Sequence, residues 1–249
     1  DATVLVKLAH DVLGDKAVAF TAASDFVPQR DVDDAKACCA KEGIEHHTVP
    51  FPILTVPHVE ENPEDRCYYC KHALFAHMKE LAAERGLAAV VDGSNLDDDG
   101  DYRPGHKALK ELAIVSPLHE AGMRKADIRA LSKALGLPTW DKPSFACLAS
   151  RFPYGAALTP EGLVRVNRAE EFLMAKGFRQ LRVRAHGEVA RIELVPEDIP
   201  RFIEKGLREE TAAYFKHIGF AYTALDLLGY RMGSLNETLH DDAETAEKP

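Results

Sequence analysis

The feature that most constrains the fold is the alternation of helix-like and strand-like segments across residues 2–135. Apolar residues recur at helical spacing in residues 2–13, 31–42, 67–86, 105–112 and 124–135. Short apolar runs that are typical of buried strands lie between them, in residues 17–24, 44–50, 87–92 and 113–115. Because strands that alternate with helices form a parallel sheet covered on both faces, we predict an α/β fold. In such folds ligands bind beyond the carboxyl ends of the strands.

The first element indicates that the fold begins before the sequence does. A helix that leads into a buried parallel strand normally follows an earlier strand, but the helix of residues 2–13 starts directly after Asp1. We therefore expect an N-terminal strand and loop, which this sequence does not contain, ahead of Asp1. A loop in that position binds phosphate in such folds. We expect the ends of residues 17–24 and 87–92 to face the same crevice as Asp1.

The pattern changes after Trp140. An irregular loop is followed by a predicted helix, a hairpin, a helical region and a strand, in residues 142–154, 160–176, 178–195, 196–217 and 219–228. This order predicts a smaller α+β unit. We therefore place a domain boundary near residue 150 and assign residues 1–150 and 151–239 to two domains. The acidic composition of residues 240–249 predicts a disordered tail.

Charge and hydropathy exclude several classes of function. The net charge of −9 disfavours nucleic acid as the main partner, because duplex binding depends on neutralising phosphates, although residues 178–191 are locally basic. No apolar run approaches the roughly 20 residues that a membrane span needs, and no charged-then-apolar leader opens the sequence. A cytoplasmic protein is therefore expected. Its odd set of five cysteines serves metal binding, catalysis or packing rather than a disulfide framework.

Three of the five cysteines have the spacing of a metal site. Cys67 and Cys70 stand at the start of a predicted helix, where the helix dipole favours thiolates, and Cys147 follows in the irregular loop. Three thiolates can hold a four-iron cluster and leave one iron open, whereas structural zinc needs four ligands. A redox pair and a zinc site remain alternatives, the zinc site being completed by a nearby histidine such as His72 or His77. The adjacent Cys38 and Cys39 are interpreted as structural residues.

Five motifs occur together in the sequence: residues 65–75 (Asp-Arg-Cys-Tyr-Tyr-Cys-Lys, ending in Phe75), 92–95 (Asp-Gly-Ser-Asn), 101–105 (Asp-Tyr-Arg-Pro-Gly), 146–155 (Ala-Cys-Leu-Ala-Ser-Arg-Phe-Pro-Tyr-Gly) and 182–193 (Arg-Val-Arg to Arg-Ile-Glu). Over nearly the whole chain this set resembles the LarE family, ATP-dependent sulfur transferases that build the nickel-pincer nucleotide cofactor. The resemblance implies an N-terminal ATP-pyrophosphatase domain with a Ser-Gly-Gly-x-Asp-Ser phosphate loop. Asp1 matches the Asp of that loop, Ala2 replaces its last Ser, and its glycines are not in the sequence.

The chemistry that the resemblance implies has two steps. ATP adenylates a carboxylate of pyridinium-3,5-dicarboxylate mononucleotide and releases pyrophosphate, and sulfur then replaces AMP to give a thiocarboxylate. Members that have only the cysteine matching Cys147 sacrifice its sulfur in a single turnover. Because this sequence also has Cys67 and Cys70, it resembles the members that deliver sulfur from a [4Fe–4S] cluster, reloaded by a sulfide or persulfide donor. Family members form homo-oligomers, including hexamers.

The same resemblance implies further site residues. Arginines that bind the anionic nucleotide substrate are Arg151, Arg182, Arg184 and Arg231. Acidic ligands for Mg²⁺ are Glu170 and Glu193. Contacts to ATP are implied for Asp1, Ser24, Lys71, Gly93 and Ser94. The alternatives are a solvated edge strand for the arginine pair 182/184 and an exposed helix position for residue 170.

Two other functions remain open at this point. One is a tRNA thiolase of the same ATP-pyrophosphatase superfamily, which the acidic net charge disfavours. The other is a zinc-stabilised nucleotide-binding module without catalytic activity, which metal analysis would distinguish. Residues 97–101 are interpreted as an acidic mobile loop, because they lack the full calcium-loop pattern.

Overall fold

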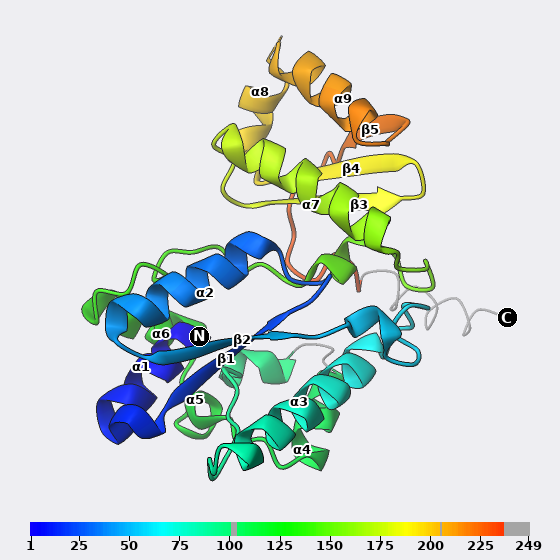
Figure 1. Ribbon diagram of the computed structural model, residues 1–249. Helices are drawn as coiled ribbons and strands as arrows, with labels where there is room; N and C mark the ends of the chain where they lie inside the picture. Colours follow the sequence, from blue (N-terminus) through cyan, green and yellow to red (C-terminus); the bar gives the residue numbers. More distant parts are fainter. Residues whose placement is uncertain (101–103, 205, 237–249) are drawn as a thin grey trace, which may run out of the picture. The chain divides into compact units, whose positions relative to one another are not determined.

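The computed structural model of the chain describes residues 1–100, 104–204 and 206–236. The chain divides into two compact units between Ser144 and Phe145, and each unit is described by itself (Figure 1). The predicted tail of residues 240–249 and the motif residues 101–103 lie outside the described residues. Within the described ranges, no helix is both long enough and apolar enough to span a membrane.

The first unit is built around a parallel strand pair. Strand β1 (Val18–Ala23) pairs in parallel with β2 (Glu45–Pro50), and Val18 lies opposite Glu45. The helices of this unit are α1 (Ala2–Leu13), α2 (Gln29–Glu42), α3 (Arg66–Glu84), α4 (Gly105–Glu111), α5 (Pro117–Glu120) and α6 (Lys125–Ala134). The prediction of an α/β fold with parallel strand pairing is confirmed.

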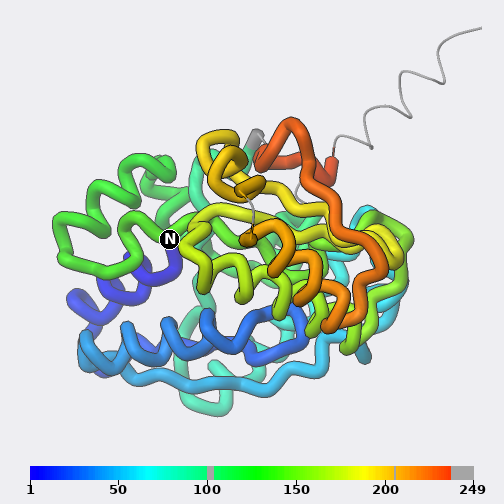
Figure 2. Tube along the Cα trace, turned by 90° about the horizontal axis from the view of Figure 1, so that it is seen from above, coloured from blue at the N-terminus to red at the C-terminus, as the bar shows by residue number. Residues whose placement is uncertain are grey.

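A hydrophobic core joins the first turn of α1 to α6, two segments that lie side by side in Figure 2. Its buried members are Val4, Leu5, Cys38, Leu118, Ile128 and Leu137. The apolar stripe of α1 supplies two of these side chains, so burial fixes the end of the helix that follows Asp1. Burial also raises the pKa of the Cys38 and Cys39 thiols, which agrees with a structural role for both.

Two of the predicted strands form only an isolated bridge. Val91 pairs in parallel with Val115, and neither residue belongs to a longer described strand. Ala113 has a φ of +52°, in the left-handed region, so the chain turns sharply just before the bridge. The Asp92 amide donates to the Val115 carbonyl at 3.0 Å, and this bond fixes Asp92 at the end of the bridge.

The second unit is a three-stranded sheet with helices on one face. Strands β3 (Leu181–His186) and β4 (Val189–Leu194) are antiparallel, and β5 (Tyr222–Leu225) is parallel to β4, in the order β3-β4-β5. Its helices are α7 (Pro160–Ala175), α8 (Ile199–Phe202) and α9 (Leu207–His217). The predicted helical region 196–217 is thus interrupted, and Gly206, with a φ of +99°, marks the start of α9.

The two faces of this sheet differ in chemistry. Alternate side chains are apolar and nearly inaccessible to solvent, namely Leu181, Val183, Ala185, Ala190, Ile192 and Leu194. The side chains of the residues between them lie on the opposite face of the sheet, where Arg182 stands opposite Glu193 and Arg184 opposite Arg191. The apolar face packs on α7, whose Phe172 ring stacks on Tyr214 of α9 with centroids 4.4 Å apart. The charged face is therefore left for polar chemistry.

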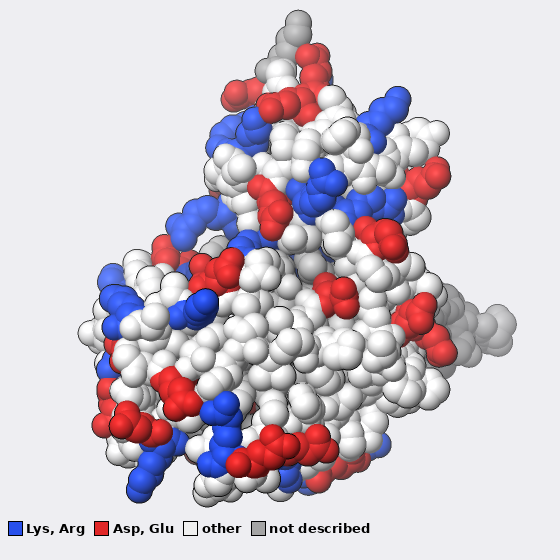
Figure 3. Space-filling view, in the orientation of Figure 1, with Lys and Arg blue, Asp and Glu red and all other residues white. Residues whose placement is uncertain are grey.

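Acidic and basic side chains are interspersed on the surface of each unit that Figure 3 shows. On this face neither sign of charge forms a large continuous patch, although the chain as a whole has a net charge of −9. Sites for an anionic ligand must therefore be sought in local clusters of side chains.

Candidate active site

The Cys67–Cys70 pair lies at the start of α3, as its second and fifth residues. Residues three apart on a helix share one face, so both thiols point to the same side. Both side chains are partly exposed. The amide groups of the first helical turn and the helix dipole favour the thiolate form, which is the form that binds metal. The pair can therefore supply two neighbouring thiolate ligands.

The donor set fits an iron–sulfur cluster in its chemistry. Thiolates are the usual ligands of such clusters, and the Cys67 Sγ already accepts a hydrogen bond from Arg66 Nη2 at 3.6 Å. The third predicted ligand, Cys147, is exposed and belongs to the second unit. Across residues 1–100, 104–204 and 206–236, no three His, Cys, Asp or Glu side chains gather as metal ligands do. His72 lies against the Tyr68 ring, with centroids 5.8 Å apart.

Lys71, directly after Cys70, reaches the end of the Val91 bridge. Its ammonium nitrogen lies 3.9 Å from Asp92 Oδ2. The same carboxylate accepts hydrogen bonds from the Ser94 hydroxyl at 2.6 Å and the Ser116 hydroxyl at 2.5 Å. Asp92 therefore links the helix that carries the cysteine pair to the loop that carries Ser94, two segments that the sequence motifs marked separately.

Gly93 allows the same loop to approach α1 closely. A Cβ atom at this position would lie 3.0 Å from the Ala2 nitrogen and 3.3 Å from Ala2 Cα. The approach of Gly93 to the start of the first helix is thus a backbone-to-backbone contact that only glycine permits. Ser24 follows β1 directly, as expected, and its carbonyl oxygen accepts the Val27 amide at 3.0 Å to form a turn.

A basic pocket opens beside Asp1. The polar residues that line it are Asp1, Lys125, Arg129, Ser132, Thr139 and Lys142. Lys125 Nζ donates to the Asp1 carboxylate at 2.6 Å, and Asn95 Nδ2 lies 3.4 Å from its other oxygen. The hydroxyl of Ser132 is buried and has no hydrogen-bond partner among the described residues. Lys125, Arg129, Lys142 and the Ser132 hydroxyl are groups that can bind a phosphate, while Asp1, which pairs with Lys125, offsets part of their positive charge.

Lys142 holds one side of this pocket. Burial opposes its charge, but hydrogen bonds to Asp34 and Asp31 outweigh burial and raise its pKa. Those bonds, of 2.7 and 2.9 Å, tie the lysine to α2. The Lys142 carbonyl also accepts from Arg129 Nη2 at 3.2 Å. The cations of the pocket are therefore held in place before any ligand arrives.

In the second unit Arg151 connects the Cys147 loop to α7. Its Nε and Nη2 atoms donate to the two oxygens of Glu170, both at 2.8 Å. Its Nη1 donates to the carbonyls of Ala146 at 2.6 Å and Cys147 at 3.1 Å. Burial opposes the charge of Arg151, but Glu170 outweighs this and raises the pKa of Arg151. The ion pair therefore fixes the backbone that presents Cys147.

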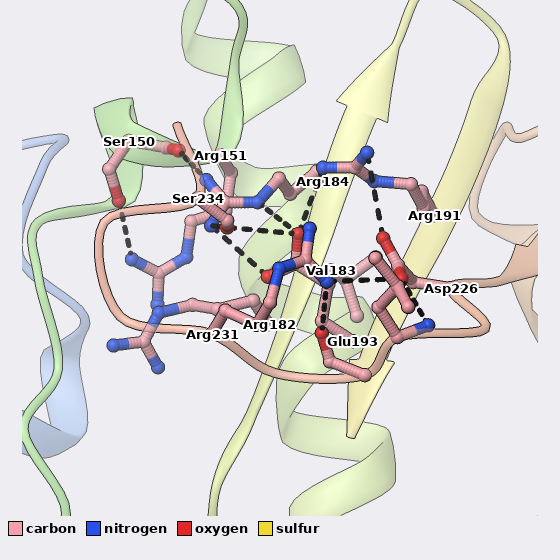
Figure 4. Close-up of polar contacts among 12 residues, drawn as sticks. Ser150, Arg151, Arg182, Val183, Arg184, Arg191, Glu193, Asp226, Arg231 and Ser234 are labelled. Carbon is pink, nitrogen blue, oxygen red and sulfur yellow. Dashed lines mark hydrogen bonds and ion pairs between the residues drawn. The ribbon is translucent and has the colours of Figure 1, made fainter. Parts of the chain in front are cut away.

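Arg184 repeats this arrangement on the charged face of the sheet (Figure 4). Its Nε and Nη2 donate to Glu193 at 2.6 and 3.1 Å, while Nη1 donates to the Ser150 carbonyl at 2.7 Å. Glu193 also accepts from Arg191 Nη2 at 2.9 Å. Glu170 and Glu193 are fully buried, so the exposed-helix alternative for residue 170 is wrong. Their role as Mg²⁺ ligands stays a prediction, because in this conformation their oxygens accept from arginine.

Arg182 is held between two aromatic rings. Its Cζ lies 5.0 Å from the Phe145 ring centroid and 5.2 Å from that of Tyr230. Burial, and then the positive charge of Arg151, lowers the pKa of Arg182 to about 10. Arg182 and Arg184 are only 4% and 6% exposed, so the solvated-edge alternative is wrong. A bound anion would offset the repulsion between these guanidinium groups.

Arg231 lies beside this cluster on the segment after β5. Its Nη1 donates to the Gly229 carbonyl at 3.1 Å and to Asp226 Oδ1 at 3.4 Å. Asp226 Oδ2 in turn lies 3.6 Å from Arg191 Nη1. All four predicted arginines thus belong to one unit, and Arg191 and Asp226 join them through contacts that the motifs did not single out.

Comparisons with known proteins place this chain among relatives. No family model matches the sequence. The chain is 45% identical over 239 residues to an uncharacterised protein of Synechocystis sp., covering 96% of this chain and 89% of the relative. An uncharacterised protein of Methanocaldococcus jannaschii is 31% identical over 185 residues, covering 74% and 71% of the two chains. The structure of the U34-tRNA thiolase NcsA from Methanococcus maripaludis, with its [4Fe–4S] cluster, matches with a TM-score of 0.38 and 15% identity, covering 95% and 76% of the two chains.

A named relative decides the family. The pyridinium-3,5-bisthiocarboxylic acid mononucleotide synthase of Lactiplantibacillus plantarum is 38% identical over 240 residues, which cover 96% of this chain and 86% of the relative. The similarity therefore extends over both units rather than over one shared motif. The chain belongs to the LarE family of sulfur transferases.

Proposed function

We propose that this protein is an ATP-dependent sulfur transferase that converts a carboxylate of pyridinium-3,5-dicarboxylate mononucleotide into a thiocarboxylate. The observation that carries the proposal is the arrangement of the thiols. Cys67 and Cys70 share one face of a helical turn, and Cys147 is exposed on a loop whose carbonyls Arg151 holds. Thiols of this kind are suited to binding or delivering sulfur. A reducing cytoplasm, where thiols persist, is the compartment that suits this chemistry.

In the first step, a carboxylate oxygen of the substrate attacks the α-phosphorus of ATP, and pyrophosphate leaves. We assign the phosphates of ATP to the basic pocket beside Asp1. Lys125, Arg129 and Lys142 would bind the leaving pyrophosphate, whose charge grows as the bond to the α-phosphorus breaks. Lys71, Ser94 and Ser24, at the ends of strand segments, are proposed to contact the rest of ATP.

In the second step, sulfur attacks the activated carbonyl carbon and AMP leaves. We assign the anionic groups of the substrate to Arg182 and Arg231, whose side chains lie next to each other in Figure 4. Arg151 and Arg184 contribute by holding the loop of residues 146–151 in place. A [4Fe–4S] cluster held by Cys67, Cys70 and Cys147 would supply the sulfur when bound. We propose that the sulfur is replaced after each turnover by a sulfide donor, or by a persulfide donor together with a thiol reductant that supplies the two electrons needed to bring its sulfur to the sulfide level.

A homo-oligomer is proposed as the working form of the protein. Large apolar side chains are exposed close to Arg231, namely Leu227 at 91%, Met232 at 82% and Leu228 at 69%. Exposed apolar side chains that lie together commonly mark surfaces for association. Sedimentation velocity of the full chain tests this, and a monomer over the micromolar range would contradict it.

The experiment that tests the function uses anaerobically reconstituted protein, ATP and the pyridinium dicarboxylate mononucleotide. We expect pyrophosphate release that depends on the mononucleotide, and thiocarboxylate product in excess of one equivalent per chain. The product is counted by mass spectrometry and iron by metal analysis. A single equivalent of product from iron-free protein would instead favour Cys147 as a sacrificial donor, which its exposure allows. Pyrophosphate release stimulated by tRNA rather than by the mononucleotide would contradict the proposed substrate.

Replacing Gly93 with alanine is expected to weaken ATP binding several-fold. The new Cβ would meet the Ala2 backbone at 3.0 Å, and backbone atoms cannot rotate away as a flexible side chain can. The loop that carries Ser94 would therefore move away from the start of α1. Isothermal titration with ATP measures the loss, and the thermal unfolding midpoint shows whether the fold is kept. An unchanged ATP affinity in a folded Gly93→Ala protein would remove this loop from the proposed site.

A further inference from the structure

Arg66 belongs to the motif of residues 65–75, but the family resemblance assigns it no role. It precedes Cys67 at the first position of α3 and is only 3% exposed. Arginine is seldom buried, because moving its charge out of water is costly. The guanidinium of Arg66 is nevertheless buried, and its Nη2 lies 3.6 Å from the Cys67 sulfur. The Cys67 sulfur is therefore one of the groups that the buried guanidinium contacts directly.

The guanidinium is fixed from two further directions. Its Nη1 donates to Asn62 Oδ1, and Asn62 is completely buried. Asn62 has a φ of +54°, a left-handed conformation that asparagine tolerates better than most residues. On another side the Arg66 Cζ lies 6.0 Å from the centroid of the Phe26 ring, which is also buried. These contacts leave the guanidinium little freedom to turn away from the sulfur.

We infer that Arg66 is a positioning residue that fixes the Cys67 sulfur and raises the reduction potential of an iron–sulfur centre bound through it. The inference rests on the proposed function, because it requires iron at Cys67. A hydrogen bond to a ligand sulfur withdraws electron density from the metal and is one of the factors that set cluster potentials. A fixed positive charge also favours the reduced state, which carries one more negative charge than the oxidised state. Both effects act in the same direction.

Replacing Arg66 with methionine is expected to lower the potential. Methionine keeps much of the buried volume but removes the charge and the N–H donor. We expect the equilibrium for reduction to become about tenfold less favourable, which corresponds to a fall of about 59 mV for a one-electron couple. An anaerobic potentiometric titration, followed by the electron paramagnetic resonance signal of the reduced centre, measures this. Arg66→Lys keeps the charge and is expected to recover part of the loss.

Two variants keep the test decisive. Arg85→Met is the matched control, because Arg85 caps the opposite end of α3, where it binds Glu45 at 3.0 Å; its potential should equal that of the wild type. Asn62→Ala leaves Arg66 and every cysteine in place but removes the hydrogen bond that holds the guanidinium. Its reduction potential therefore tests the inference if the Arg66→Met protein binds no iron. If iron-loaded Arg66→Met or Asn62→Ala protein has the potential of the wild type, the inference about Arg66 is wrong, while the proposed function stands. Wild-type protein that binds no iron contradicts the proposed function itself.

Discussion

Replacing Cys147 with serine is expected to reduce thiocarboxylate formation to background while pyrophosphate release from ATP continues. Serine has nearly the same shape, but its hydroxyl neither ionises near neutral pH nor binds iron as a thiolate does. The chemistry of ATP is assigned to the first unit, whereas Cys147 belongs to the second. The two half-reactions should therefore separate. Pyrophosphate is measured with a coupled assay, and the product is measured by mass spectrometry.

Cys38→Ala provides the control for Cys147→Ser. Cys38 is 8% exposed and belongs to the core beside α1, so its loss should leave product formation close to the wild-type level. Cys67→Ser separates the two sulfur sources. If sulfur comes from a bound cluster, Cys67→Ser protein makes no product and holds less iron. If Cys147 is sacrificed, Cys67→Ser protein still makes one equivalent. Wild-type product from Cys147→Ser protein would contradict both schemes.

The helices can be predicted from the sequence because their apolar periodicity is local. The predicted helix of residues 2–13 corresponds to α1, Ala2–Leu13, and the predicted helix of residues 160–176 corresponds to α7, Pro160–Ala175. In α7 the ends carry their own signals, since Thr159 caps the first turn by accepting the Gly162 amide at 3.0 Å. Such features depend on neighbours within a few residues, which the sequence displays directly.

Strand pairing is harder to predict because it depends on distant partners. The run of residues 87–92 is apolar enough for a strand, yet only Val91 forms a bridge, with Val115. Whether an apolar run becomes a strand is decided by what lies beside it, not by its own composition. Residues 196–217 show a different limit, because Gly206 and its positive φ break a pattern that is helical on either side.

The candidate site shows a similar limit. The motifs identified the arginines and carboxylates of the second unit, but not that they pair with each other. Arg151 lies 19 positions before Glu170 in the sequence, and the two side chains meet only because α7 packs beside the loop that carries Arg151, so no local spacing reveals the pair. Lys125 and Lys142 were missed for the same reason, since only the folded chain places them beside Asp1. Arg66 belongs to the motif of residues 65–75, but no role follows from the motif, because only the folded chain shows that its guanidinium reaches the Cys67 sulfur.

Replacing Glu170 with alanine is expected to have the largest effect on stability. Glu170 is fully buried and neutralises Arg151, which is 1% exposed. Removing one partner of such a pair leaves an uncompensated buried charge and typically costs about 3–5 kcal/mol of the free energy of unfolding. Glu170 also accepts the Val183 amide at 3.0 Å, so the helix loses its bond to β3 as well. Urea unfolding of the whole chain, followed by circular dichroism, measures the change.

The neighbouring Glu171 provides a matched control, because it is exposed on the same helix and accepts from Asn167 at 3.1 Å. Glu171→Ala should change the free energy of unfolding by no more than about 0.5 kcal/mol. The double variant Arg151→Met, Glu170→Leu removes both charges and should recover most of the stability. It should not recover sulfur transfer, because no guanidinium then holds the Ala146 and Cys147 carbonyls. Equal unfolding midpoints for Glu170→Ala and Glu171→Ala would show that the buried pair does not stabilise this unit. A double variant with full sulfur-transfer activity would show that Arg151 does not position Cys147.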